Sequence, residues 1–188
     1  MAWNERYLAE DTPWDRGGPT LALSHWLASV EQTLRVAVPG CGRGHDVVEL
    51  ARQGHQVVAL DIAPVALDQL RQRLEAEELQ ALVELADVLV WQPETRLDAV
   101  YEQTCLCALG PEHWVTYAHQ LHSWLKPGGT LAVSFMHTHR DGGPPWHCPI
   151  DRMRELFPAS RWSWPHHGGL RIPHREGLYE LAYQLERL

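Results

Sequence analysis

The feature that most limits what this chain can fold into is a strand, a glycine-rich turn and a helix in immediate succession. A β-branched and apolar run, residues 33–39, leads into Gly40, Gly42 and Gly44, and apolar residues with helical spacing follow. Glycine lets the backbone pass close to a ligand because no side chain blocks the approach. The segment therefore predicts a nucleotide-like cofactor bound against this turn.

The glycine spacing narrows the kind of cofactor. A dinucleotide-binding turn follows the pattern G-x-G-x-x-G, which would place the third glycine at position 45. This chain has His45 there and its third glycine at Gly44. The G-x-G-x-G form suits a cofactor without a pyrophosphate, so a nicotinamide-dependent oxidoreductase, which shares the fold, fits the sequence poorly.

Acidic residues follow the next two candidate strands. Asp61 ends the second apolar run, about twenty residues after the turn, where a carboxylate accepts hydrogen bonds from ribose hydroxyls. Asp87 follows the third run and could accept from an adenine amino group. Ile62 and Val88 would supply apolar contacts to the ring faces.

Strand and helix patterns alternate along the chain, which predicts an α/β fold with a doubly wound parallel sheet and helices on both faces. The tail, residues 178–188, fits both a period of two and a helical stripe, so periodicity leaves it open. The expected strands are residues 33–39, 56–60, 81–86, 97–101 and 130–136; the expected helices follow Gly44, begin at Pro64 and begin at Pro111, and residues 126–129 form a turn.

Bulk properties exclude several classes of protein. The length of 188 residues suits one domain, residues 1–188, and a net charge of −8 argues against sequence-independent nucleic-acid binding, which needs clustered Lys and Arg. No apolar stretch approaches the roughly 18 residues that span a bilayer. We therefore expect a cytoplasmic protein that binds neither nucleic acid nor membrane, as a monomer or weak dimer.

Six segments match a known pattern: residues 12–15, 38–46, 54–61, 107–109, 125–129 and 142–145. Through them, nearly the whole chain resembles the thiopurine methyltransferase superfamily, especially its halide/thiol (thiocyanate) methyltransferase branch. The resemblance implies a Rossmann-like class I methyltransferase fold whose mostly parallel seven-stranded sheet has an antiparallel last strand, residues 178–188. It also implies the cofactor S-adenosylmethionine, with S-adenosylhomocysteine as product, and an aromatic lid segment, residues 1–32.

The family pattern assigns cofactor contacts by position. Tyr7 and Gln103 depart from the branch, which usually has tryptophan and tyrosine there, and Gln103 lies near the expected methyl group. Cys41, within the turn, is expected to be a small packed residue rather than a nucleophile. The expected cofactor-binding residues are Trp3, Tyr7, Trp14, Gly40, Cys41, Gly42, Asp61, Ile62, Asp87, Val88 and Gln103.

The implied reaction is an in-line methyl transfer to a small soft nucleophile: a thiol, sulfide, thiocyanate or halide. It needs orientation and removal of water more than acid/base chemistry. His137, with His139 beside it, could deprotonate a thiol, and the alternative is a solvated histidine pair. The expected acceptor pocket is aromatic and apolar, with Trp14, Gln103, Met136, His137, Pro144 and Trp146.

Three alternatives stay open. The acceptor could be a larger thiol or thiopurine, or a metalloid oxyanion. The chain could also be a non-catalytic module that binds S-adenosylmethionine or S-adenosylhomocysteine. Its twelve histidines, with Cys105 and Cys107, suggest a metal site, but no segment shows a clean ligand spacing, so we expect no metal.

Overall fold

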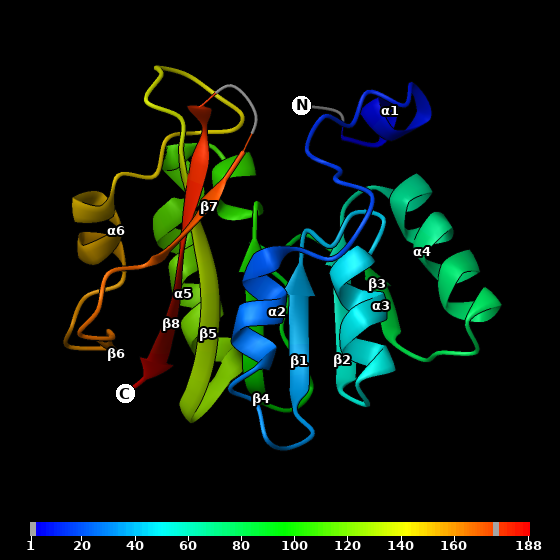
Figure 1. Cartoon of the computed structure of the whole chain (residues 1–188), viewed down its shortest axis with the longest axis horizontal. Helices are drawn as coiled ribbons and strands as arrows, with labels where there is room; N and C mark the ends of the chain where they lie inside the picture. Colours follow the sequence, from blue (N-terminus) through cyan, green and yellow to red (C-terminus); the bar gives the residue numbers. More distant parts are fainter. Residues whose placement is uncertain (1–2, 175–176) are drawn as a thin grey trace. The chain divides into compact units, whose positions relative to one another are not determined.

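The structure, a computed structural model, describes residues 3–174 and 177–188. The chain forms two compact units, Met1–Val88 and Leu89–Leu188, which are described separately (Figure 1). Within the described ranges, no helix is both long and apolar enough to cross a membrane.

The first unit alternates helices with parallel strands, as the periodicity predicts. Strand β2 lies between β1 and β3, and the registers Pro39↔Leu60 and Asp61↔Leu85 bring the carboxyl ends of the three strands to one edge. The elements are α1 (Trp3–Leu8), α2 (Leu21–Leu27), β1 (Arg35–Pro39), α3 (His45–Arg52), β2 (Gln56–Asp61), α4 (Pro64–Ala76) and β3 (Leu82–Leu85).

Helix α4 packs one apolar face against the rest of this unit. Leu67, Leu70 and Leu74 recur on one face of the helix, and all three are buried. Pro64 occupies the first helical turn, where its missing N–H costs no hydrogen bond. The helix packs against β2 and β3 and so covers that part of the sheet.

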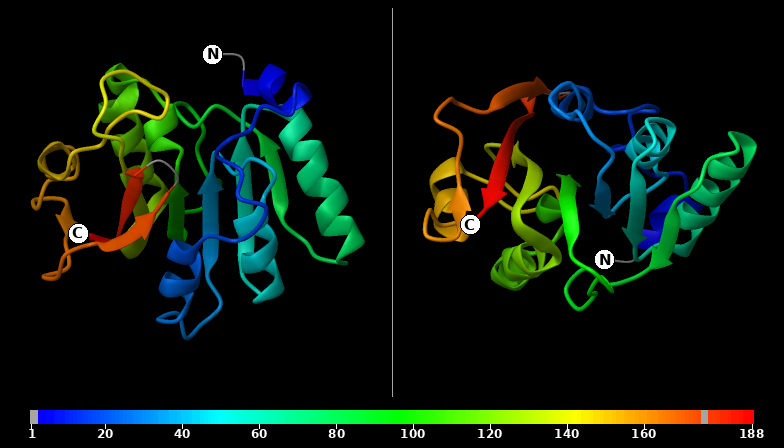
Figure 2. Two further views of the ribbon diagram at one scale, coloured as in Figure 1. Left: turned by 45° about the horizontal axis from the view of Figure 1, so that its top comes forward. Right: turned by 90° about the horizontal axis from the view of Figure 1, so that it is seen from below.

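The second unit is a mixed sheet. Strands β4 and β5 are parallel, and β8 runs antiparallel to β5 with the pairs Thr130↔Glu186 and His137↔Tyr179. Strand β7 pairs with the other edge of β8, and both views in Figure 2 show the two side by side. The elements are β4 (Leu97–Gln103), the 3₁₀ turns η1 (Leu106–Ala108) and η2 (Pro111–His113), α5 (Trp114–Trp124), β5 (Leu125–His137), α6 (Ile150–Leu156), β6 (Trp162–Ser163), β7 (Leu170–Pro173) and β8 (Tyr179–Arg187).

The predicted antiparallel last strand is confirmed, because β8 covers nearly all of residues 178–188. The predicted number of strands is wrong: the described residues form eight rather than seven. The difference arises at the outer edge of β8, where β7 pairs with its first residues and β6 with its last. These short strands satisfy backbone groups that an open edge would leave unpaired.

Two predicted boundaries are also wrong. Residues 126–129 do not form a separate turn before the strand: they belong to β5, where the pairing with β4 shifts between Leu125 and Thr130. Gly128, at φ 76°, absorbs this irregularity in the strand. The helix expected from Pro111 begins only at Trp114, after the 3₁₀ turn η2.

Candidate functional site

The glycine turn of the first unit has the left-handed backbone that favours glycine. The φ angles of Gly40, Gly42 and Gly44 are 60°, 54° and 73°. A Cβ atom on Gly42 would lie 2.7 Å from the hydroxyl oxygen of Tyr7, and one on Gly44 would lie 2.2 Å from a methyl group of Leu70. Gly44 is therefore required by helix packing, while Gly42 allows a ring to approach the turn.

Asp61 is fixed by the backbone at the end of β2. Its side chain is buried, and its two carboxylate oxygens accept hydrogen bonds from the N–H groups of Gly42 at 2.8 Å and Ala63 at 2.9 Å. Burial raises the pKa of this carboxyl group above its usual value, although the N–H donors act in the opposite direction. Each oxygen keeps a second lone pair, so the group can also accept from the two hydroxyls of a ribose.

The three aromatic residues predicted to form a lid lie together. Trp14 Nε1 donates to the hydroxyl of Tyr7 at 3.2 Å, and the ring centroids of Trp3 and Trp14 are 5.3 Å apart in an edge-to-face arrangement. Tyr7 is buried and stands over Gly42. The cluster thus lies against the glycine turn at Gly42.

The other predicted cofactor residues of this unit follow β2 and β3. Ile62 comes directly after Asp61 and is 56% exposed, so it offers the apolar surface expected beside a flat ring. Asp87 is exposed, whereas Val88 is buried. Cys41 is half-buried, and its backbone N–H donates to the carbonyl of Leu60 at 2.9 Å.

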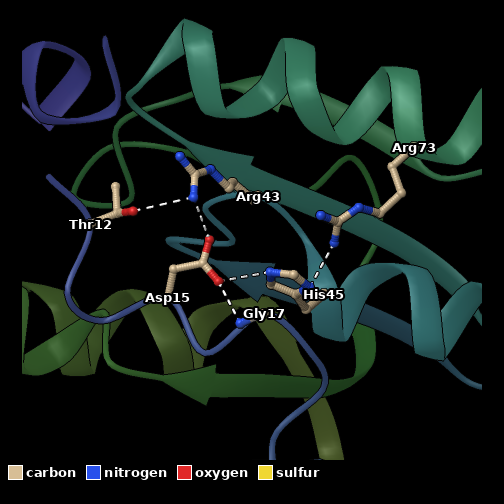
Figure 3. Close-up of a pocket in the computed structure, with 6 residues that line it drawn as sticks. All are labelled: Thr12, Asp15, Gly17, Arg43, His45 and Arg73. Carbon is tan, nitrogen blue, oxygen red and sulfur yellow. Dashed lines mark hydrogen bonds and ion pairs between the residues drawn. The ribbon is translucent and has the colours of Figure 1, made fainter. Parts of the chain in front are cut away.

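A polar pocket of about 450 Å³ lies beside the glycine turn, and its residues were not singled out as functional from the sequence (Figure 3). Asp15 is at its centre. The carboxylate accepts from Arg43 Nη1 at 2.9 Å, His45 Nε2 at 2.8 Å and the N–H of Gly17 at 2.8 Å. Asp15 thereby ties the segment that carries Trp14 to the two residues on either side of Gly44.

The hydrogen bonds also define the state of His45. Arg73 can only donate, and its Nη1 lies 2.7 Å from His45 Nδ1, so Nδ1 is the acceptor and Nε2 carries the proton that it donates to Asp15. Burial and the charge of Arg73 lower the pKa of His45. Burial acts to raise the pKa of Asp15, but hydrogen bonds from Gly17, Arg43 and His45 lower it overall.

In the second unit, the rings of several histidines meet where β5 ends. His137 is buried and stacks on Tyr179, with ring centroids 4.8 Å apart and planes 7° from parallel. His147 and His139 lie 5.3 and 5.9 Å from His137. Burial and these two imidazoles lower the pKa of His137 to about 4, so the ring is neutral at pH 7.

This histidine cluster lacks the geometry of a metal site. Thr138 N–H donates to Nδ1 of His147 at 3.2 Å, which occupies one of its ring nitrogens. Across residues 3–174 and 177–188, no group of three His, Cys, Asp or Glu side chains is arranged to hold a metal ion.

The remaining predicted pocket residues of this unit flank the loop after β5. Trp146 packs on Gly143, where an added Cβ would lie 2.5 Å from the indole ring. The backbone N–H of Trp146 donates to the carbonyl of Cys107 at 2.8 Å. The carbonyl of Met136 accepts from Cys148 N–H at 2.8 Å. Pro144, between them in the loop, is half-buried.

A buried carboxyl cluster in the second unit was not expected from the sequence. Glu180 accepts from Gln103 Nε2 at 2.8 Å, and His174 Nε2 lies 3.3 Å from the same oxygen. Glu102, next to Gln103 in β4, is fully buried. Gln103 was predicted to lie near the transferred methyl group, so this cluster includes one residue of the predicted acceptor pocket.

Two comparisons with known sequences identify the family. The profile of the thiopurine S-methyltransferase family matches residues 1–165. The chain is 32% identical to probable thiol methyltransferase 2 of Arabidopsis thaliana and 34% identical to thiocyanate methyltransferase 1 of the same plant. Each match covers 82% of this chain and 70% of the relative. The predicted resemblance is therefore confirmed.

Solved structures support the same fold. A Burkholderia thailandensis 1,6-didemethyltoxoflavin N1-methyltransferase, solved with S-adenosylhomocysteine, matches 97% of this chain and 84% of its own with a TM-score of 0.79 at 21% identity. Magnesium protoporphyrin IX methyltransferase from Synechocystis, solved with S-adenosylmethionine, matches 99% of this chain and 93% of its own with a TM-score of 0.78 at 16% identity. The Rossmann-like class I methyltransferase fold is confirmed, and the chain belongs to the thiopurine S-methyltransferase family of S-adenosylmethionine-dependent methyltransferases.

Proposed function

We propose that this protein transfers the methyl group of S-adenosylmethionine to a small soft nucleophile, a thiol, sulfide, thiocyanate or halide, by in-line displacement. The observation that carries the proposal is the buried carboxylate of Asp61, which accepts a hydrogen bond from the N–H of Gly42 next to the hydroxyl group of Tyr7. Similarity to thiol and thiocyanate methyltransferases over most of the chain supports the acceptor class.

In this proposal the first unit binds the adenosyl group. Asp61 accepts from the ribose hydroxyls, the backbone at Gly40 and Gly42 passes along the nucleoside, and Ile62 covers one face of the adenine. Bound S-adenosylmethionine supplies an electrophilic methyl group on a sulfonium centre. The rings of Tyr7 and Trp14 attract such a cation and exclude water from it. The proposed contacts of this unit are Trp3, Tyr7, Trp14, Gly40, Cys41, Gly42, Asp61, Ile62, Asp87 and Val88.

The second unit contributes the acceptor side. A desolvated nucleophile reacts faster because its hydration shell no longer has to be displaced during attack. His137 stays neutral because its pKa is lowered, and its buried Nε2 has no hydrogen-bond partner among the described residues. It is therefore suited to accept a hydrogen bond from an incoming thiol. The proposed acceptor residues of this unit are Gln103, Met136, His137, Pro144 and Trp146.

The test is a methyl-transfer assay with labelled S-adenosylmethionine and a panel of acceptors: an alkanethiol, hydrosulfide, thiocyanate, iodide, a thiopurine and a metalloid oxyanion. We expect turnover with the small nucleophiles, and its loss in Asp61→Asn. Asp11→Asn is the matched control, because Asp11 is exposed and pairs only with Arg6 in the described structure. Turnover on the thiopurine alone would contradict the acceptor class, and cofactor binding without any turnover would indicate a binding module.

A further inference from the structure

The polar pocket of the first unit has positively charged walls that the chain itself only partly neutralises. All six residues that line it belong to this unit, and none of them was assigned to the cofactor. Two guanidinium groups, of Arg43 and Arg73, line the pocket together with one carboxylate, that of Asp15 (Figure 3). Asp15 pairs with Arg43, and among the described residues no carboxylate forms an ion pair with Arg73. In a chain with a net charge of −8, this local positive charge does not come from a generally basic surface.

The carboxylate of Asp15 is already occupied by its own partners. Its Oδ2 accepts from Arg43, and its Oδ1 accepts from His45 and from the N–H of Gly17. Arg73 is connected to Asp15 only through the imidazole of His45, which accepts from Arg73 at Nδ1 and donates to Asp15 at Nε2. With this hydrogen bonding His45 is neutral, so the pocket holds one positive charge in excess.

Several N–H groups of the two guanidinium groups have no acceptor in the described part of the chain. Arg43 donates from Nε and Nη1 to three side chains, which leaves its Nη2. Arg73 donates only from Nη1, to His45, which leaves its Nε and Nη2. Both arginines are half-buried, so these donors remain accessible from the pocket. Arginine presents its donors in a planar fork, and this geometry matches the oxygens of carboxylates and phosphates.

We propose that this pocket binds a phosphate group, either free or as the monoester of a small molecule, between Arg43 and Arg73. A carboxylate has two oxygens, which one arginine fork already occupies, whereas a phosphate group has enough oxygens to accept from both arginines. The volume of about 450 Å³ lies within the range of roughly 300–1,000 Å³ that is usual for small-molecule sites. The proposal does not depend on methyl transfer, because none of these groups is placed in the cofactor or acceptor site.

The site joins three parts of the first unit. Asp15 lies in the segment before α2, Arg43 lies in the glycine turn, and Arg73 lies in α4. A phosphate bound between them should stabilise the folded unit, because a ligand that binds only the folded state shifts the unfolding equilibrium. The charge of Asp15 opposes any anion in the pocket, so we expect a modest affinity that depends on both arginines.

The test is calorimetric titration with inorganic phosphate and with glycerol 3-phosphate, at a constant ionic strength set with chloride. Arg73→Gln leaves the three hydrogen bonds of Asp15 in place and should raise the Kd for both probes about tenfold, the effect expected from losing a charge-assisted hydrogen bond. Arg71→Gln is the matched control, because it removes the same charge from the same helix. Arg71 is exposed and donates to Asp68 and to the carbonyl of Val83, outside the pocket. Its loss should change the Kd by less than about twofold, since solvent and salt screen an exposed charge.

Thermal unfolding provides a second readout. Both probes should raise the Tm of the wild type and of Arg71→Gln, and should raise the Tm of Arg73→Gln much less at the same concentration. The two probes also distinguish the sources of the phosphate group. Tighter binding of glycerol 3-phosphate would identify an organic phosphate as the ligand, and equal affinity would identify free phosphate.

Three results would overturn the proposal. A wild type that binds neither probe would do so, whether or not the variants fold. Equal weakening by Arg71→Gln and Arg73→Gln would show an effect of overall charge rather than a site. Displacement of phosphate by S-adenosylhomocysteine would place the cofactor in this pocket and so contradict a separate site.

Discussion

Replacing Asp15 with asparagine should weaken both the fold and cofactor binding. The side chain is 12% exposed and accepts from two charged or polar side chains and one backbone N–H. Asparagine keeps one acceptor oxygen but turns an NH₂ group toward donors, so one charge-assisted hydrogen bond is lost. Such a bond contributes about 1.5–3 kcal/mol. We therefore expect a loss of about 2 kcal/mol in the free energy of unfolding and a decrease in Tm of about 4–8 °C.

Asp15→Asn should also weaken cofactor binding, because Asp15 directly follows Trp14 in the sequence. When the ties to Arg43 and His45 weaken, Trp14 is held less firmly beside Tyr7, and we expect the Kd for S-adenosylmethionine to rise about tenfold, or about 1.4 kcal/mol. Urea unfolding and calorimetric titration measure the two effects. Asp11→Asn is the control and should change stability by less than about 0.5 kcal/mol, because its ion pair is exposed. If Asp15→Asn behaves like this control in both assays, the hydrogen bonds of Asp15 stabilise neither the fold nor the cofactor site.

Two further predictions concern the same unit. Gly44→Ala combines a positive φ with a Cβ inside the Leu70 side chain, so urea unfolding should show a loss of about 2–4 kcal/mol; a loss under about 0.5 kcal/mol would contradict the packing. The pKa of His45 is lowered in the folded state, so its contribution to stability is complete above the unfolded pKa of about 6.5 and is lost as the pH falls through the lower, folded pKa. The wild type should therefore lose stability below pH 6.5, as followed by urea midpoints at several pH values, and His45→Gln should lose less; an equal slope in both proteins would contradict this.

The elements around the glycine turn could be predicted because their determinants are local. Residues 33–61 contain a strand, a turn that only glycine allows and a second strand, and each is specified by neighbours in sequence. The lid residues were identified through the family pattern rather than through spacing. Among them, Tyr7 contacts Gly42. Tyr7 lies thirty-five positions away from Gly42 in the sequence, so periodicity could not predict this contact.

The missed features depend on residues far apart in the chain. Arg73 reaches His45 across 28 positions, and Gln103 reaches Glu180 across 77. An isolated carboxylate on a strand looks the same in sequence whether it is solvated or buried, so Glu180 gave no indication of its surroundings. The tail alternates with a period of two from Tyr179, but Leu178, Leu181 and Leu185 also recur at helical spacing, and the pairing with β5 decides for the strand.

The most direct test is a crystal structure of the protein with S-adenosylhomocysteine. We expect the ribose hydroxyls to lie within about 3 Å of the Asp61 carboxylate, with the nucleoside along residues 40–42 and the aromatic rings of Tyr7 and Trp14 beside the sulfur. A ligand bound elsewhere, or a ribose with no contact to Asp61, would show that Asp61 is not the ribose-binding residue.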